Sequence, residues 1–435
     1  MLVTPERLTW AIVGLSGAIT LWNALAYPSG AGYDANAHKT YSDYLLAHHR
    51  LPDRNGSWEY YSPPLYYIVA AIATLVGRHI GAGDPYKLAQ LINVPIVVGT
   101  ILVVAALARL LWPERRWLAP VAAGFVALSP VLVRTAAMFH PEPLDLLLAA
   151  VSGYLATRML VRRRYGVGAA IGLGVTTGLA QMVRQFALYT LAVVTIAWIV
   201  AAVWNAEDRR ALLRAGLLAL AACIVVAGPW YGYRQSRSSN AVFDRPPQTR
   251  PIWDRRPASF YLGTGLPTVF SRPYRPHLEN RAWPQTYSDI WGDWFGVFAW
   301  AHRTERDVPS RARADWLAAQ NVIGIVPTLL AIGGWLGLLV AAVRRRAAPV
   351  LVVALLPLAG LLGYFFFAIA YPTVDGDVLK PTFMLSTLWA WALCFAWAAT
   401  ALGRRWPRLI AVTLVALAFL DLPFLVYNGA LGFFS

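Results

Sequence analysis

The acidic, basic and histidine side chains that could do chemistry in this chain stand beside its long apolar stretches. Charged groups at membrane depth are costly, so those near the ends of membrane helices are candidates for function. The candidates are Asp34, His38, His48, His49, Glu59, His140, Glu142, Arg184, Asp289, Asp293, Asp375, Asp377 and Lys380.

Asp34 is the first candidate for catalysis. It precedes the segment ANAHKTYSDYLLAHHR, in which Tyr41, Leu45 and His48 recur at helical spacing. Asp is a favoured N-cap residue, and the helix dipole would keep its carboxylate ionised. An ionised carboxylate can accept the proton of an attacking hydroxyl. The alternative is that Asp34 only caps the helix, and the local sequence taken alone favours that alternative.

Glu142 is the second candidate, in the motif His140-Pro-Glu-Pro. Its two prolines break the chain, so we expect Glu142 to be presented at the membrane surface. His140 and Glu142 could also bind a metal, but no HExxH spacing supports a metal site. The alternative is a polar turn near the interface.

Arg184 and Lys380 are candidates for binding a phosphate. Arg can bind a phosphate through two parallel hydrogen bonds and Lys as a point charge. For Lys380 the alternative is snorkelling to the membrane interface. The aromatic residues of 283–300, including Trp291, could stack on sugars or form an interfacial belt.

The composition indicates an all-α polytopic membrane protein. Hydrophobic residues make up 58% of the 435 residues and charged residues only 14%, whereas a soluble domain carries roughly a quarter charged residues. Apolar stretches long enough to cross a bilayer recur along the whole chain. The formal charge of +16 is explained by arginines in short cytoplasmic loops, so no nucleic-acid partner is expected.

Arginine placement decides between about eleven and about twelve membrane spans. With about eleven, every short arginine cluster faces the cytoplasm, as the positive-inside rule requires. Residues 62–80 then form an interfacial or re-entrant helix, and two extracytoplasmic segments, 28–87 and 231–320, carry juxtamembrane helices. The second segment is rich in Trp and Tyr and should fold against the bundle. The clusters are 115–116, 162–164, 209–214, 344–346 and 404–408.

Four motifs in order resemble those of GT-C glycosyltransferases, in the branch of protein O-mannosyltransferases and lipid A aminoarabinose transferases (glycosyltransferase family 39-like). They are Asp34-Ala35 for the usual Asp-Glu, Pro63-Pro64-Leu65-Tyr66-Tyr67, Glu142-Pro143-Leu144 for Asp-Pro-Leu, and Gly178-Leu179-Ala180 leading to Arg184 for Lys. The resemblance covers nearly the whole chain, 1–435, as a single GT-C-like membrane domain.

The resemblance implies an inverting transfer of a sugar from a polyprenyl-phosphate carrier to an extracytoplasmic glycan, lipid or protein. Asp34 would be the base, assisted by Glu142, and Arg184 and Lys380 would hold the donor phosphate. The enzyme would lie in the inner or plasma membrane with its site outside. The resemblance assigns no definite cofactor, and a divalent metal ion is one option. Candidates for sugar, acceptor or metal contacts are His38, Glu59, Tyr66, His140, Asp289 and Trp291.

The alternative function is that of a transporter or flippase for a lipid-linked or anionic substrate. Such a protein would also need a basic cavity. Transporters more often have inverted repeats and charges near mid-membrane, and no such repeat is evident here. The two functions therefore predict sites at different depths in the membrane.

Overall fold

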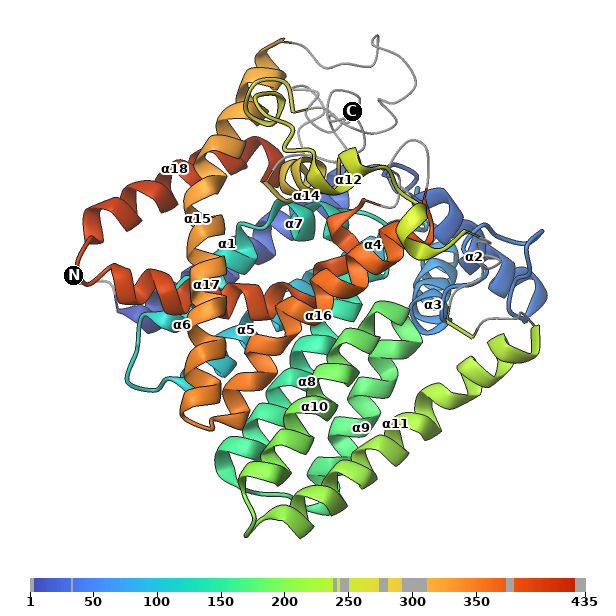
Figure 1. Ribbon diagram of the computed structural model, residues 1–435. Coiled ribbons are helices and arrows are strands. Elements are labelled where there is room, and N and C mark those ends of the chain that lie inside the picture. Colours follow the sequence, from blue (N-terminus) through green and yellow to red (C-terminus); the bar gives the residue numbers. More distant parts are fainter. Residues whose placement is uncertain are drawn as a thin grey trace.

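The computed structural model describes residues 4–32, 34–237, 241–242, 250–273, 281–291, 311–372 and 379–426, and these residues form helices and no strand (Figure 1). The chain is a polytopic helical membrane protein, as its composition predicts. The α-helices are α1 Pro5–Ala26, α2 Ala35–His48, α3 Leu65–His79, α4 Lys87–Leu91, α5 Asn93–Leu111, α6 Leu118–Ala127, α7 Pro130–Ala137, α8 Glu142–Arg162, α9 Val167–Val183, α10 Leu188–Trp204, α11 Arg209–Arg237, α12 Ala258–Leu262, α14 Ala282–Trp291, α15 Arg311–Arg344, α16 Ala348–Ala370, α17 Leu388–Leu402 and α18 Pro407–Leu425. The 3-10 helices are η1 Gln185–Ala187, η2 Ile252–Asp254, η3 Thr268–Phe270 and η5 Pro381–Thr387.

Within these ranges, eight helices are long and apolar enough to cross a membrane, and α6 with α7 makes a ninth span if the bent pair counts as one. The two helices meet at 53°. Ser129 precedes Pro130 and adopts an extended conformation (φ −73°, ψ 110°), as steric clash with the proline ring requires. Three apolar helices, α3, α9 and the apolar part of α18, are shorter. Counting α9 and α18 gives the eleven predicted spans, and counting α3 as well gives twelve, so the number eleven stays a prediction.

Small residues allow the helices of the bundle to approach closely. A Cβ atom on Gly174 of α9 would overlap the Ala219 carbonyl oxygen of α11. One on Gly334 of α15 would overlap the Cys394 carbonyl oxygen of α17. Small residues at such crossings bring backbones into van der Waals contact, which drives helix association in lipid.

The arginine clusters lie at one end of the bundle. Arg163 Nε donates to Asp208 Oδ2 over 2.7 Å, which ties the α8–α9 link to the α10–α11 link. Burial, and then the charges of Arg404 and Arg345, lower the pKa of Arg115, so these three clusters are also neighbours. In Figure 1 the links α5–α6, α8–α9, α10–α11, α15–α16 and α17–α18 follow the lower and left edge. This common side is what the positive-inside rule predicts, and its assignment to the cytoplasm stays a prediction.

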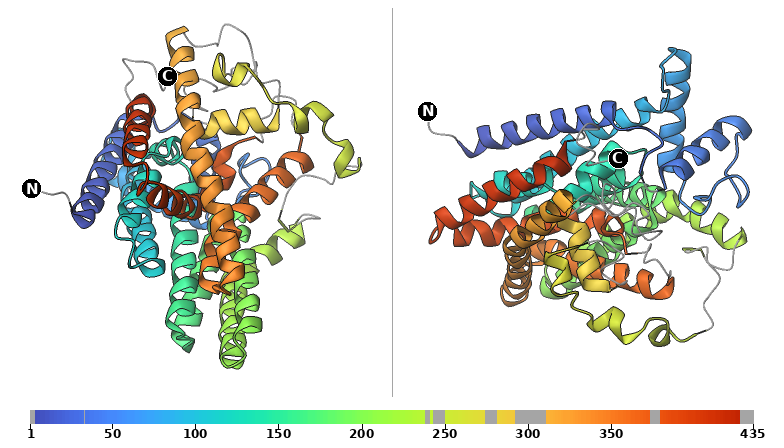
Figure 2. Two further views of the ribbon diagram at one scale, coloured as in Figure 1. Left: turned by 60° about the vertical axis from the view of Figure 1, so that its left-hand side comes forward. Right: turned by 90° about the horizontal axis from the view of Figure 1, so that it is seen from above.

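Helices α2 and α3 lie at the other end. Figure 2 (right) shows them beyond the end of α1 that is remote from the N-terminus. The chain leaves α1 at Tyr27, and Lys87 Nζ donates to the Ala24 carbonyl oxygen over 3.1 Å and to the Tyr27 carbonyl oxygen. A cation at a helix C-terminus stabilises the unpaired carbonyl groups. The first segment is thereby fixed against the bundle at both of its ends.

Parts of the second segment, 231–320, contact α16 around η2, α12 and α14. Arg256 Nε and Nη2 donate to the Ala368 carbonyl oxygen over 3.0 and 2.6 Å, and Arg255 Nη1 donates to that of Ala370 over 3.1 Å. The hydroxyl groups of Thr286 in α14 and Tyr364 in α16 are 2.9 Å apart. Arginines therefore cap this end of α16, which holds α12 and α14 beside the bundle.

Candidate active site

Arg184 is the centre of a buried polar network. It ends α9 in an extended conformation (φ −148°, ψ 143°), at the turn between α9 and α10 where the sequence predicts it. Its Nε lies 2.6 Å from Glu142 Oε1, and its Nη1 lies 3.2 Å from Glu59 Oε2. Nη1 also donates to Ser62 Oγ over 2.8 Å. The side chain is 5% exposed, so its cation is engaged by two carboxylates and closed to bulk solvent.

Glu142 is the first residue of α8 and is buried, so the expectation that it is presented at the membrane surface is wrong. The physical reason lies in its contacts. Arg184 binds one carboxylate oxygen and His140 Nδ1 contacts the other. Paired and hydrogen-bonded in this way at a helix N-terminus, a carboxylate can remain buried.

His38 is an uncharged member of the same network. Its Nδ1 is 2.8 Å from the Tyr67 hydroxyl and 4.0 Å from Glu59 Oε2, and its ring meets the ring of His140 edge-on at 4.5 Å. Burial lowers the pKa of His38 well below its usual value, and the positive charges of His140 and Arg184 lower it further. The structure therefore places His38 as a neutral hydrogen-bonding residue between α2 and α3.

Asp34 does not cap α2. It occupies the N-cap position, but its side chain makes no capping hydrogen bond and its backbone is left-handed (φ 56°, ψ −1°), a conformation that Asp tolerates better than most residues. Its Oδ2 instead accepts a hydrogen bond of 3.0 Å from Lys380 Nζ. The capping alternative is therefore wrong, because the left-handed turn directs the carboxylate to Lys380.

Lys380 lies just before η5 and is 3% exposed, whereas the Asp34 side chain is 24% exposed. The ammonium group therefore does not snorkel to the interface. It is held inside the protein by a carboxylate that solvent can reach. This ion pair therefore consists of a partly exposed carboxylate and a buried ammonium group.

The other candidate residues lie in different surroundings. Tyr66 is buried, with its ring edge-on to Phe139. Asp289 is also buried, and Trp291 donates from Nε1 to Thr328 Oγ1 over 2.7 Å and packs on α15, which leaves little of its ring for a sugar. His48 and His49 are exposed at the end of α2. Asp293, Asp375 and Asp377 lie outside the described residues.

Two residues near this network, Ser62 and Asp145, are not among the site residues predicted from the sequence. Ser62 donates to Glu59 Oε2 over 2.5 Å and accepts a hydrogen bond from Arg184. Asp145 is buried beside Ser386, and one of its oxygens has no hydrogen-bond partner among the described residues. The signal for Asp145 is its spacing, because i and i+3 positions share a helix face and Asp145 follows Glu142 by three.

The described residues contain no group of three or more His, Cys, Asp and Glu side chains placed to hold a metal ion. His38, Glu59, His140 and Glu142 come nearest to such a group by type. Their carboxylates, however, are bound to Arg184. A metal does not fit this donor set as it stands.

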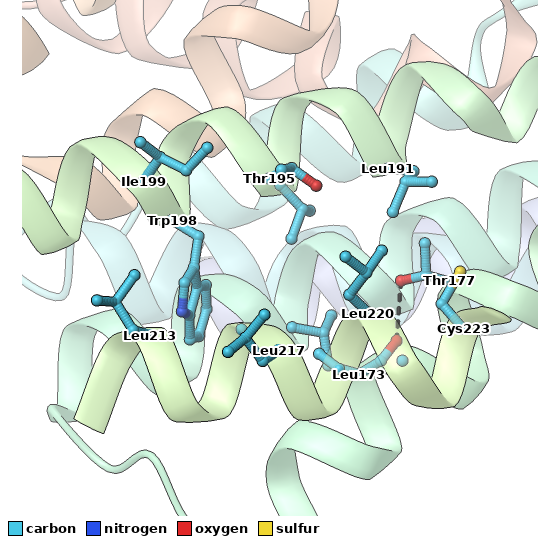
Figure 3. Close-up of a pocket in the computed structure, with 14 residues that line it drawn as sticks. Leu173, Thr177, Leu191, Thr195, Trp198, Ile199, Leu213, Leu217, Leu220 and Cys223 are labelled. Atoms are coloured by element: carbon cyan, nitrogen blue, oxygen red, sulfur yellow. Dashed lines mark hydrogen bonds between the residues drawn. The ribbon is translucent and has the colours of Figure 1, made fainter. Parts of the chain in front are cut away.

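A separate hollow of about 220 Å³ lies between α9, α10 and α11 (Figure 3). It is lined by apolar side chains such as Leu173, Ile199, Leu217 and Leu220, and the last three are exposed on the outer surface of the helices. Thr177 also faces it and satisfies its hydroxyl on the Leu173 carbonyl oxygen. The hollow suits a hydrocarbon chain and offers little to a polar ligand.

Solved structures share this fold. The apo oligosaccharyltransferase from Archaeoglobus fulgidus matches with a TM-score of 0.58 and 14% identity, covering 97% of this chain and 56% of that chain. The complex of that organism's AglB with an inhibitory peptide and a dolichol-phosphate matches with a TM-score of 0.53 and 13% identity, covering 98% and 55%. The chain therefore spans about half the length of the oligosaccharyltransferase that it matches.

ArnT from Cupriavidus metallidurans bound to undecaprenyl phosphate matches at 14% identity over 98% of this chain and 75% of that chain, with a TM-score of 0.49. The fold assignment rests on the oligosaccharyltransferase, whose TM-scores are higher. No protein-family model matches the chain, and no curated protein matches it. The chain shares the fold of the archaeal oligosaccharyltransferase, and identities this low establish the fold alone.

Proposed function

We propose that this protein is a membrane glycosyltransferase that takes its sugar from a polyprenyl-phosphate carrier. The observation that carries the proposal is the pair of Asp34 and Lys380, a partly exposed carboxylate 3.0 Å from a buried ammonium group, on a fold shared with a transferase. A sugar transfer from a phosphate needs both groups, a base for the acceptor and a cation for the departing phosphate.

In the proposed reaction, the acceptor hydroxyl oxygen attacks the anomeric carbon on the face opposite to the phosphate. The bond from the acceptor oxygen to the anomeric carbon forms as the bond to the phosphate oxygen breaks. The electron pair of the broken bond goes to the phosphate, and the hydroxyl proton goes to Asp34. Lys380 stabilises the charge that develops on the phosphate.

We assign Arg184 a different part from the one that the sequence predicts. Its contacts with Glu59 and Glu142 occupy the groups with which it would bind a phosphate. We assign it the task of holding the 59–62 turn against α8, with Glu142, His140 and His38 as members of that support. A direct contact between Arg184 and the carrier phosphate requires that one of these pairs open.

The hollow between α9, α10 and α11 is a place for part of the carrier's hydrocarbon chain. From Thr177, α9 runs seven residues to Arg184, roughly 10 Å at the rise of an α-helix. A carrier with its phosphate at this end of the bundle would thus pass the hollow along its tail. The proposed site lies outside the cytoplasm, in the cell membrane, with the 231–320 segment contacting the glycan, lipid or protein acceptor.

The transporter alternative is weaker on this geometry. It predicts a substrate site near mid-membrane, between broken helices. Asp34 follows α1 and Lys380 precedes the η5–α17 span, so both stand at helix ends. No observation favours transport over transfer.

The test is mass spectrometry of cell-envelope glycans and glycoproteins from cells with the gene, without it, and with the Asp34→Asn variant. We expect one sugar modification to depend on the gene, and the variant to lose it. General-base catalysis is worth about 10²–10⁴-fold in rate. Asp43→Asn, which alters an exposed carboxylate bound to Arg78, is the matched control and should keep the modification. A modification that persists at full level in Asp34→Asn would remove Asp34 as the base, and unchanged glycans in cells without the gene would overturn the proposed function.

A further inference from the structure

The contact between Asp34 and Lys380 raises a problem for any anionic donor. Lys380 is 3% exposed and its ammonium nitrogen already lies 3.0 Å from a carboxylate oxygen. A phosphate that approaches Lys380 meets that carboxylate first, because Asp34 is the more exposed of the two partners. The pair is neutral, so it presents little attraction for an anion from a distance.

The neighbouring network does not supply the missing positive charge. Arg184 contacts two carboxylates, Glu59 and Glu142, which gives these three side chains a net charge of −1. A proton on His140 would bring that charge only to zero. His38 adds none, because burial keeps it neutral. The side chains of Arg184, Glu59, Glu142 and His38 therefore add no net positive charge to the Asp34–Lys380 pair.

We propose that Asp34 and Lys380 form a latch that the donor phosphate opens. The phosphate and Asp34 compete for the Lys380 ammonium group, so the carboxylate is released to act as a base only when a donor is bound. This inference rests on the proposed function and adds to it an order of events, in which donor binding precedes activation of the acceptor hydroxyl. Without a donor, the base is masked by its own cation.

The backbone at Asp34 makes the latch testable. Asn tolerates the left-handed conformation about as well as Asp, so Asp34→Asn removes the charge and keeps the turn. A phosphate site remote from Asp34 should be indifferent to this change. A latch predicts that the loss of Asp34 strengthens anion binding, because the carboxylate that competes with the phosphate for Lys380 is then gone.

The experiment measures binding of farnesyl phosphate to the full chain in detergent micelles at low salt. We expect Asp34→Asn to bind about tenfold more tightly than the wild type, equivalent to about 1.4 kcal/mol. Lys380→Gln should bind more weakly, and adding Asp34→Asn to Lys380→Gln should give no gain. Asp43→Asn, in the exposed pair with Arg78, should match the wild type. Thermal unfolding of each variant shows that it is folded.

Unchanged or weaker binding by folded Asp34→Asn, with clear binding by the wild type, would overturn the latch and leave the proposed function standing. A gain of the same size in the Lys380→Gln background would also overturn it, because the gain would not pass through Lys380. Absence of binding by the wild type and every variant would overturn the donor class and the latch together.

Discussion

Replacing Arg184 by Gln tests whether this residue supports the site or binds the phosphate. The side chain is buried, and the change would leave the carboxylates of Glu59 and Glu142, each 2% exposed, without their shared cation. Removing one partner of a buried ion pair costs about 3–5 kcal/mol. Ser62 and His140 would each keep a contact with one of the carboxylates, so we expect a loss within that range and not above it.

The assay is denaturation of the purified protein in detergent, with Arg78→Gln as the matched control. Arg78 also pairs with a carboxylate, Asp43, but both side chains are exposed, so the control should lose less than about 1 kcal/mol. Adding Glu142→Gln to Arg184→Gln removes one stranded charge and should recover part of the stability. An Arg184→Gln protein as stable as the wild type, with a large loss in affinity for farnesyl phosphate, would refute this reasoning and restore Arg184 as the phosphate ligand.

Three further predictions concern the bundle and its surroundings. Because the pKa of His38 is lowered in the folded protein, the unfolded state takes up a proton first as pH falls below about 6.5, and the free energy of unfolding should drop by up to about 1.4 kcal/mol per pH unit there. In thermal unfolding, the His38→Gln variant should lose stability less steeply with falling pH, and the control His79→Gln should behave as the wild type. An unchanged slope in His38→Gln would contradict the neutral state assigned to His38. Gly174→Ala should destabilise the protein by about 1–3 kcal/mol, because the added methyl group would overlap α11. The control Gly172→Ala has nothing within 4 Å of the added atom and should be neutral or stabilising by up to about 1 kcal/mol. Equal effects of the two changes in denaturation assays would show that α9 and α11 pack less closely than described. Cysteines introduced at 115, 163 or 405 should react with a membrane-impermeant reagent only after the membrane is opened, and labelling of intact cells at 115 or 163 would defeat the predicted orientation.

The sequence predicts the helical scaffold well because its signals are local. Apolar length marks the spans, and the arginines at 115, 163, 209, 345 and 405 predict that five links share one side, where contacts such as Arg163 with Asp208 place them. The position of Arg184 at the α9–α10 turn follows in the same way. These predictions need only the order of residues along the chain.

The contacts within the site are not local, and the sequence could not assign them. Asp34 precedes a helix as a capping residue would. Its left-handed backbone, which the sequence does not reveal, directs its carboxylate to Lys380 instead. Arg184 suits a phosphate by type, yet its partners Glu59 and Glu142 lie 125 and 42 residues away along the chain. Their distances from Arg184 depend on how the first segment packs against α8. Residue type thus predicted which side chains matter better than what each one contacts.

The pairing of Asp34 with Lys380 also bears on how the protein is made. These residues are 346 positions apart, so the carboxylate reaches its side of the membrane long before the lysine is synthesised. Nine of the eleven predicted spans precede Lys380 and must be inserted before the two can meet. A nascent chain, or a product cut short in any link before η5, would carry the acid without its cation. Biogenesis would therefore yield no partially active intermediate, and two separately expressed halves should regain transfer only when they assemble in the same bilayer.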